Sequence, residues 1–80
     1  MTSVAGKSIL LVEDDKLVGA ALKEMLSVLG YSVIDVEDGK SATEIIESTS
    51  PIDVLLTDLA LPGSISGIGV VRSAVAHRPG

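Results

Sequence analysis

The strongest constraint on the fold is a set of three short apolar runs, each separated from the next by one segment with helical periodicity. The runs cover residues 8–12, 31–36 and 53–57, which read SILLV, YSVIDV and DVLLT. Short runs of this kind are typical of strands in the buried parallel sheet of an α/β protein. Because one helical segment lies between each pair of runs, the order β-α-β-α-β-α predicts parallel strands joined by right-handed crossovers.

The helical segments show apolar residues at helical spacing. In the first, which we expect to begin at Asp15 as N-cap and to end at Gly30, the predicted core face is Val18, Leu22, Met25 and Leu29. In the second, the predicted face is Ala42, Ile45 and Ile46. The third is expected to begin near Ile68 and to stop at Pro79 and Gly80, with Val71, Ala74 and Val75 facing inward.

Length and composition narrow the class of protein. A chain of 80 residues forms one domain at most. Its formal net charge of −5 argues against direct binding to nucleic acid or to an anionic membrane surface. It has no cysteine, so neither a disulfide framework nor a thiolate metal site is available. With no signal peptide pattern and no apolar run near the ~20 residues of a membrane helix, we expect a soluble, cytoplasmic α/β domain.

Acidic residues follow two of the predicted strands. Glu13, Asp14 and Asp15 come directly after the first, and Asp58 comes directly after the third. Open parallel sheets place their ligand sites beyond the carboxyl ends of the strands, so we expect Glu13, Asp14 and Asp58 to converge. Clustered carboxylates repel one another unless a cation offsets them. Mg²⁺ prefers such oxygen ligands, whereas calcium would want more of them and zinc would want histidine or cysteine.

Three segments together resemble the receiver domain of two-component response regulators. They read ILLVEDD, GYSVIDVEDG and DVLLTDLALPG followed by SG, and they extend over nearly the whole chain. The resemblance implies a flavodoxin-like, doubly wound parallel sheet, present here in part with strand order 2-1-3. It also implies a signalling module rather than an enzyme.

The resemblance implies a role for each matching residue. Asp58 matches the aspartate that accepts a phosphoryl group from a sensor histidine kinase or a phosphotransfer protein. Asp14 matches the acid that binds Mg²⁺ directly, and Glu13 matches its neighbour, which acts through water. The backbone carbonyl of Ala60 matches a further metal ligand. The implied metal set is therefore Glu13, Asp14, Asp58 and Ala60.

The chain also departs from the family pattern. Receiver domains continue with two more strands and helices, which supply a serine or threonine and a lysine to the phosphoryl group. We therefore expect residues 1–80 to be a C-terminally incomplete receiver domain, with the apolar strand at 53–57 left as an uncovered edge. Such an edge invites pairing with another chain. The alternative function is thus a non-phosphorylated interaction fragment that associates through this edge, including with itself.

Two further classes fit the residues less well. Phosphatases of the haloacid dehalogenase type also use an aspartate after a strand, but they need a second aspartate where this chain has Ala60. A dinucleotide-binding fold needs glycines after the first strand, where this chain has acids. His77 is interpreted as a partner of a helix C-terminus rather than as a phosphorylated histidine.

Overall fold

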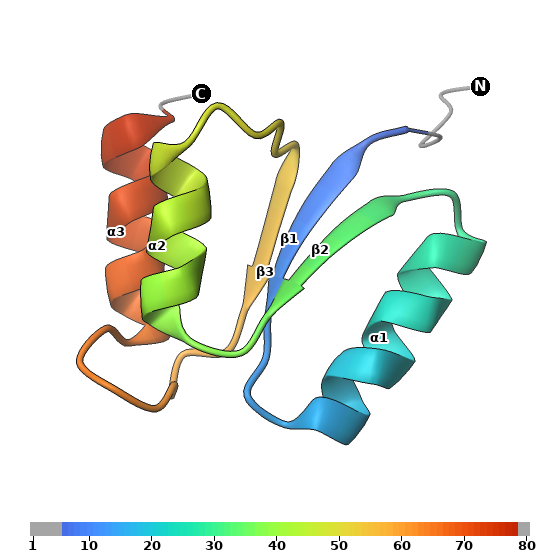
Figure 1. Ribbon diagram of the computed structural model, residues 1–80, viewed down its shortest axis with the longest axis horizontal. Coiled ribbons are helices and arrows are strands. Elements are labelled where there is room, and N and C mark those ends of the chain that lie inside the picture. The colour runs from blue at the N-terminus through green and yellow to red at the C-terminus, as the bar shows by residue number, and fades with distance from the viewer. Residues whose placement is uncertain (1–5, 79–80) are drawn as a thin grey trace.

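The computed structural model describes residues 6–78 and contains three strands and three helices in strict alternation (Figure 1). The elements are β1 (Ser8–Val12), α1 (Lys16–Val28), β2 (Ser32–Val36), α2 (Gly39–Glu47), β3 (Val54–Thr57) and α3 (Gly67–His77). All strand pairs are parallel, and the strand order is β2-β1-β3. This confirms the predicted partial flavodoxin-like sheet of order 2-1-3.

The central strand β1 is buried along its whole length. Residues 8–12 are all buried, and β1 pairs with β2 from Ser8↔Ser32 to Val12↔Val36. On its other side it pairs with β3 from Ile9↔Val54 to Val12↔Thr57. Helix α1 covers one face of the sheet, and α2 and α3 lie together on the other (Figure 1). The main core lies under α2 and α3, where Leu10 and Val12 of β1 meet the helices.

Helix α1 begins and ends as predicted. The Asp15 side chain accepts the backbone N–H groups of Leu17 and Val18, at 2.9 and 3.1 Å, and so caps the N-terminus. Beyond the C-terminus, Gly30 adopts φ 104°, and its N–H donates to the carbonyl of Ser27. A left-handed residue at this position favours glycine, which explains why the helix stops here.

Each helix turns a glycine-led stripe toward the sheet, with buried or half-buried residues at i, i+3 and i+7. The stripes are Gly19, Leu22 and Leu26 in α1; Gly39, Ala42 and Ile46 in α2; Gly67, Val70 and Ala74 in α3. The first residue of each stripe is a buried glycine. In α2 and α3 a Cβ at this position would collide with backbone atoms, so these two helices lie unusually close to the segment beneath them.

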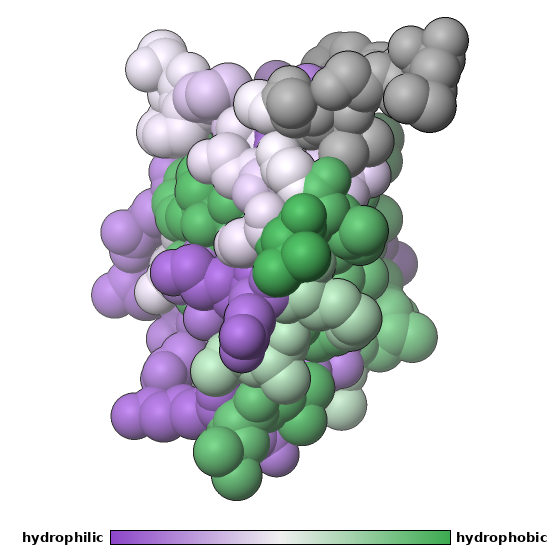
Figure 2. Space-filling model, turned by 90° about the vertical axis from the view of Figure 1, so that its right-hand side faces the viewer, coloured by the Kyte–Doolittle hydropathy of each residue, from purple (hydrophilic) through white to green (hydrophobic). Residues whose placement is uncertain are grey.

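The predicted core face of the first helix is largely wrong. Val18, Met25 and Leu29 are 43%, 56% and 60% exposed, and only Leu22 of the predicted set is half-buried. The reason is that α1 packs mainly against β1 and β2 and is the sole helix on its face of the sheet within residues 6–78. Only a narrow stripe is therefore covered, and hydrophobic residues reach the surface of this side of the molecule (Figure 2).

The predicted face of the third helix is also wrong in part. Val71 and Val75 are exposed, while Val70 is fully buried and Ala74 is half-buried. The helix begins at Gly67, one residue earlier than expected, and the contact of that residue with the backbone after β3 sets which side faces inward. Pro79 and Gly80, which were expected to end the helix, lie outside the described residues.

Arg78 joins the C-terminal ends of the two paired helices. Its guanidinium donates hydrogen bonds to the carbonyls of Ile45, Ile46 and Ser48 at the end of α2, at 3.3, 2.9 and 2.8 Å. These carbonyls include acceptors that the helix cannot satisfy itself, and the positive charge suits a helix C-terminus. One side chain beyond α3 therefore caps α2.

We predict that Arg78→Met lowers the free energy of unfolding by about 1–2 kcal/mol, because charge-assisted hydrogen bonds to the α2 carbonyls are lost while the apolar stem is kept. Urea unfolding followed by circular dichroism measures this. Arg72→Met is the matched control, since Arg72 is exposed on α3. An equal loss in both variants would contradict the capping role.

Asp38 caps the N-terminus of α2. Its carboxylate accepts the backbone N–H of Ser41 at 2.7 Å, and this bond, with that from the Ser41 side chain, lowers the pKa of Asp38. The nearby charge of Lys40 lowers this pKa further. Because the folded-state pKa lies below that of the unfolded chain, the contribution of Asp38 to stability is present above the unfolded value of about 3.9.

We predict that this contribution disappears as the pH falls below about 4 and through the folded-state pKa of Asp38. Asp38→Asn keeps a capping oxygen but cannot titrate, so the variant should lose less stability than the wild type between about pH 5 and 3. Urea unfolding at a series of pH values checks this. Parallel pH profiles for the two proteins would show that the Asp38 carboxylate does not contribute.

Candidate functional site

Two strand ends deliver the acidic residues to one edge of the sheet. The backbone N–H of Glu13 donates to the Val36 carbonyl at 3.0 Å, and the N–H of Asp58 donates to the Val12 carbonyl at 3.1 Å. The hydrogen bonds between strands thus continue one residue beyond β1 and β3. The backbones of Glu13 and Asp58 are therefore held by the sheet itself rather than by a free loop.

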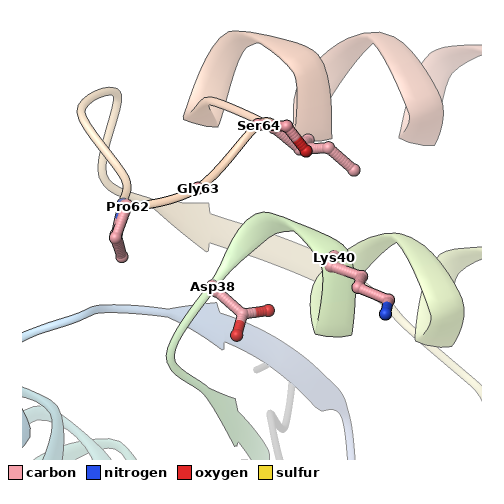
Figure 3. A pocket seen from close by; sticks show the side chains of 6 residues that line it. Asp38, Lys40, Pro62, Gly63 and Ser64 are labelled. Atoms are coloured by element: carbon pink, nitrogen blue, oxygen red, sulfur yellow. The ribbon is translucent and has the colours of Figure 1, made fainter.

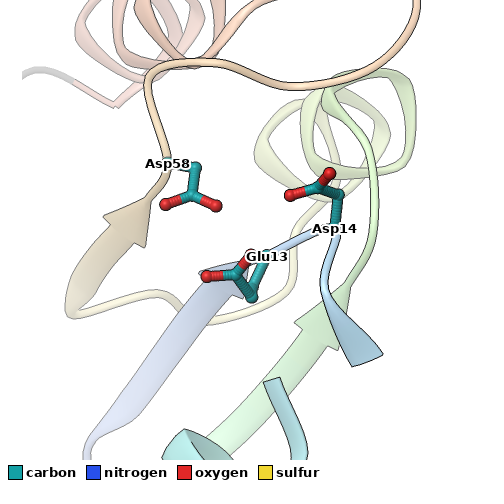
Figure 4. A group of neighbouring side chains, drawn as sticks. All are labelled: Glu13, Asp14 and Asp58. Atoms are coloured by element: carbon teal, nitrogen blue, oxygen red, sulfur yellow. The ribbon is translucent and has the colours of Figure 1, made fainter. Parts of the chain in front are cut away.

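Three carboxylates meet at this edge (Figure 4). One carboxylate oxygen each from Glu13, Asp14 and Asp58 lies within 4.8 Å of the others. Glu13 and Asp58 are half-buried and Asp14 is exposed, so the cluster is open to solvent on one side. The structure thus brings together the three acids that the sequence singles out.

The charges of this cluster are not offset by a protein cation within residues 6–78. The two ion pairs found there join Lys16 to Glu37 at 3.9 Å and His77 to Glu47 at 3.7 Å, both away from the cluster. The position of His77 at the end of α3 agrees with its interpretation as a partner of the helix C-terminus. Clustered carboxylates with oxygen donors only are a suitable ligand set for a hard divalent cation such as Mg²⁺.

Asp15 and Ala60 lie near the three carboxylates in the sequence, but their surroundings differ. The carboxylate of Asp15 is engaged with the start of α1, and its backbone N–H donates to Glu13 Oε2 at 3.1 Å, which helps to orient the Glu13 side chain. Ala60 is exposed in the loop after β3, two residues beyond Asp58. Its role as a carbonyl ligand stays a prediction.

A tight backbone contact lies directly behind Asp58. The N–H of Gly67 donates to the Leu59 carbonyl at 3.0 Å. A Cβ at Gly67 would collide with the carbonyl oxygen of Asp58 and would lie 2.6 Å from Leu59 Cα. This contact was not predicted from the sequence, although the i, i+3, i+7 stripe that begins at Gly67 is a signal of it.

Two hollows flank the site. One of about 170 Å³ lies beside the acids and is lined by Leu11, Val12, Glu13, Leu22, Leu56, Thr57 and Asp58. A second of about 290 Å³ lies between the start of α2 and the loop after β3 (Figure 3). The first hollow therefore combines the carboxylates of Glu13 and Asp58 with a mainly apolar lining.

No helix within residues 6–78 combines the length and the apolar character that crossing a membrane requires.

Comparison with known proteins places the chain in a family. The family model for the response regulator receiver domain matches residues 9–79. A cyclic di-GMP phosphodiesterase of Thermotoga maritima is 40% identical over 72 residues, which are 90% of this chain and 18% of that protein. The chain therefore spans only a small part of this relative.

Solved structures of receiver domains have the same fold. A response regulator receiver protein from Sinorhizobium medicae matches with a TM-score of 0.89 and 28% identity, covering 92% of this chain and 60% of that one. The receiver domain of a sensor histidine kinase from Pseudomonas aeruginosa, solved with a magnesium ion coordinated in its active-site cleft, matches with a TM-score of 0.83 and 36% identity. That match covers 92% of this chain and 59% of the other.

Three observations point to the same family: the family model covers most of the chain, solved receiver domains share its fold, and three carboxylates gather at one edge of its sheet. The chain belongs to the response regulator receiver domains, the signalling modules of two-component phosphorelay systems.

Proposed function

We propose that Asp58 accepts a phosphoryl group from a sensor histidine kinase or a phosphotransfer protein in the cytoplasm, and that Glu13, Asp14, Asp58 and the Ala60 carbonyl hold Mg²⁺. The observation that carries this proposal is the convergence of three carboxylates within 4.8 Å at the carboxyl edge of the sheet. The magnesium ion in the active-site cleft of the Pseudomonas relative supports the choice of metal.

The proposed reaction is a phosphoryl transfer between two nucleophiles. An Oδ atom of Asp58 attacks phosphorus, the bond from phosphorus to the donor histidine nitrogen breaks, and the imidazole leaves with that electron pair. The product is an acyl phosphate on Asp58. A bound Mg²⁺ supplies the positive charge that offsets the phosphoryl oxygens and the neighbouring carboxylates.

The residues of this chain contribute position more than covalent chemistry, as phosphoryl transfer generally requires. The hydrogen bond from the Asp58 N–H to the Val12 carbonyl holds the backbone of the nucleophilic residue at the end of the sheet. The Asp15 N–H holds one oxygen of Glu13, which limits the movement of that carboxylate. After transfer, the new charge of about −1.5 to −2 stands beside acids that already repel one another, so the local electrostatics change strongly.

We predict that the purified chain incorporates phosphate from acetyl phosphate in the presence of Mg²⁺, that Asp58→Asn abolishes incorporation, and that Asp14→Asn or removal of the metal lowers it about tenfold or more. Intact mass spectrometry, with hydroxylamine trapping of the acyl phosphate, measures the product. Glu44→Gln is the control, since Glu44 is an exposed carboxylate of α2 outside the acidic cluster. Unchanged incorporation in Asp58→Asn would refute the assignment.

The open edge of β3 supports a second candidate function, which is association without phosphorylation. Within residues 6–78, β3 pairs only with β1, and its Val54 and Leu56 side chains are 43% and 42% exposed. A second copy could add its own β3 in an antiparallel manner. A pair centred on Leu55 and Leu56 would place Asp53 of each copy opposite Asp58 of the other, which opposes the association.

We predict for this candidate that the chain forms a dimer that strengthens as salt screens these aspartates, and that Leu56→Lys weakens the dimer by protecting the edge. Sedimentation equilibrium over a range of concentrations and salt measures the dissociation constant. Ile68→Lys adds the same charge at an exposed apolar residue of α3 and serves as the control. A monomer at all concentrations and salt levels would exclude the candidate.

A further inference from the structure

We propose that Gly39, at the start of α2, is a positioning residue for the acidic site, acting through the loop of residues 59–66. The proposal rests on the proposed function for its metal readout, and it assigns a role to an element that supplies none of the acids. Three consecutive contacts carry it, from α2 to Ile65, from Ile65 to the start of α3, and from α3 to Asp58.

The first contact joins Gly39 to Ile65. Gly39 is buried, and a Cβ at this position would collide with the carbonyl oxygen of Ile65 and lie 2.8 Å from the Cβ of the same residue. Real Cβ atoms are essentially never found closer than 3.0 Å to such neighbours. Because one of the obstructing atoms belongs to the backbone, a side-chain rotation cannot relieve the clash, and the loop itself would have to move.

The second and third contacts pass this constraint to the site. Ile65 is followed directly by Ser66, whose Oγ accepts the Gly69 N–H at 3.3 Å and caps α3, and then by Gly67. Gly67 donates its N–H to Leu59 and lies against the carbonyl oxygen of Asp58. A shift at Ile65 therefore displaces Gly67, which contacts the carbonyl of Asp58 and the backbone of Leu59.

The tip of the loop is open to solvent. Pro62, Gly63 and Ser64 are exposed and line one side of the 290 Å³ hollow, across from Asp38 and Lys40 (Figure 3). The inner points of the loop are anchored where Gly67 meets Leu59, where Ile65 meets Gly39 and where Leu61 packs against the core. Ala60, whose carbonyl is the proposed ligand, lies between these anchors.

The test compares Gly39→Ala with the wild type by two readouts. The first is the amide chemical shifts of Asp58, Leu59 and Ala60 in ¹H–¹⁵N spectra without metal, and the second is the Mg²⁺ dissociation constant from calorimetric titration. We expect Gly39→Ala to shift these amides and to raise the dissociation constant about tenfold or more, as is typical when a residue that orients metal ligands is changed.

Arg78→Met is the matched control, because it weakens the opposite end of α2 without touching the loop. It should leave both the amide shifts and the dissociation constant as in the wild type. Wild-type amide shifts and wild-type affinity in Gly39→Ala would overturn the proposal. An equal loss of affinity in Arg78→Met would also overturn it, because the loss would then follow from lower stability in general.

Ile65→Ala keeps the test decisive if Gly39→Ala does not fold. It introduces no clash, and it removes the side chain through which Ile65 packs against α2 and α3. The same amides should shift, and unchanged shifts would overturn the proposal. If the wild type binds no Mg²⁺, the proposed metal site fails, while the metal-free shifts still decide whether Gly39 positions Asp58.

Discussion

The approach of α3 to the backbone behind Asp58 is the contact on which the arrangement around the site depends. Only a residue without a Cβ fits at Gly67, because the carbonyl oxygen of Asp58 fills the space that a side chain would take. This contact sets the starting point of α3 and the side of the helix that meets the sheet. It also ends the loop after β3, so the position of Asp58 and the packing of α3 are determined together.

The two faces of the sheet differ because of how the helices are distributed. On the α2 and α3 face, the fully buried Leu10, Ala42 and Val70 form a continuous core, and Arg78 ties the far ends of the two helices together. On the other face, α1 stands alone within the described part of the chain and leaves apolar side chains exposed. The acids lie at the edge where both faces meet, so their backbones are held by β1 and β3 while their carboxylates stay accessible.

The site combines rigidity in its backbone with unfavourable charge in its side chains. Hydrogen bonds of the sheet extend to Glu13 and Asp58, and the Asp15 N–H restrains the Glu13 carboxylate. Clustered carboxylates would separate if they were free to do so, because like charges in partly buried surroundings repel. A rigid support that keeps the carboxylates close favours the binding of a positively charged ligand. The ends of β1 and β3 provide this support.

The alternation of apolar runs and helical segments determined the order, direction and pairing of the strands, since parallel strands with single-helix crossovers leave few arrangements. The acids after residues 12 and 57 likewise determined that Glu13, Asp14 and Asp58 would meet, because carboxyl ends of parallel strands share one edge. Periodicity identified the buried side of α2, where Ala42 and Ile46 are buried, but not the buried stripe of α1 or α3, as the errors at Met25 and Val71 show. In these two helices apolar residues occupy more than one face. Only the tertiary structure decided those two stripes, through the close contact of Gly67 with the backbone after β3 and through the place of α1 as the sole helix on its face within residues 6–78. Both depend on distances between segments far apart in the sequence.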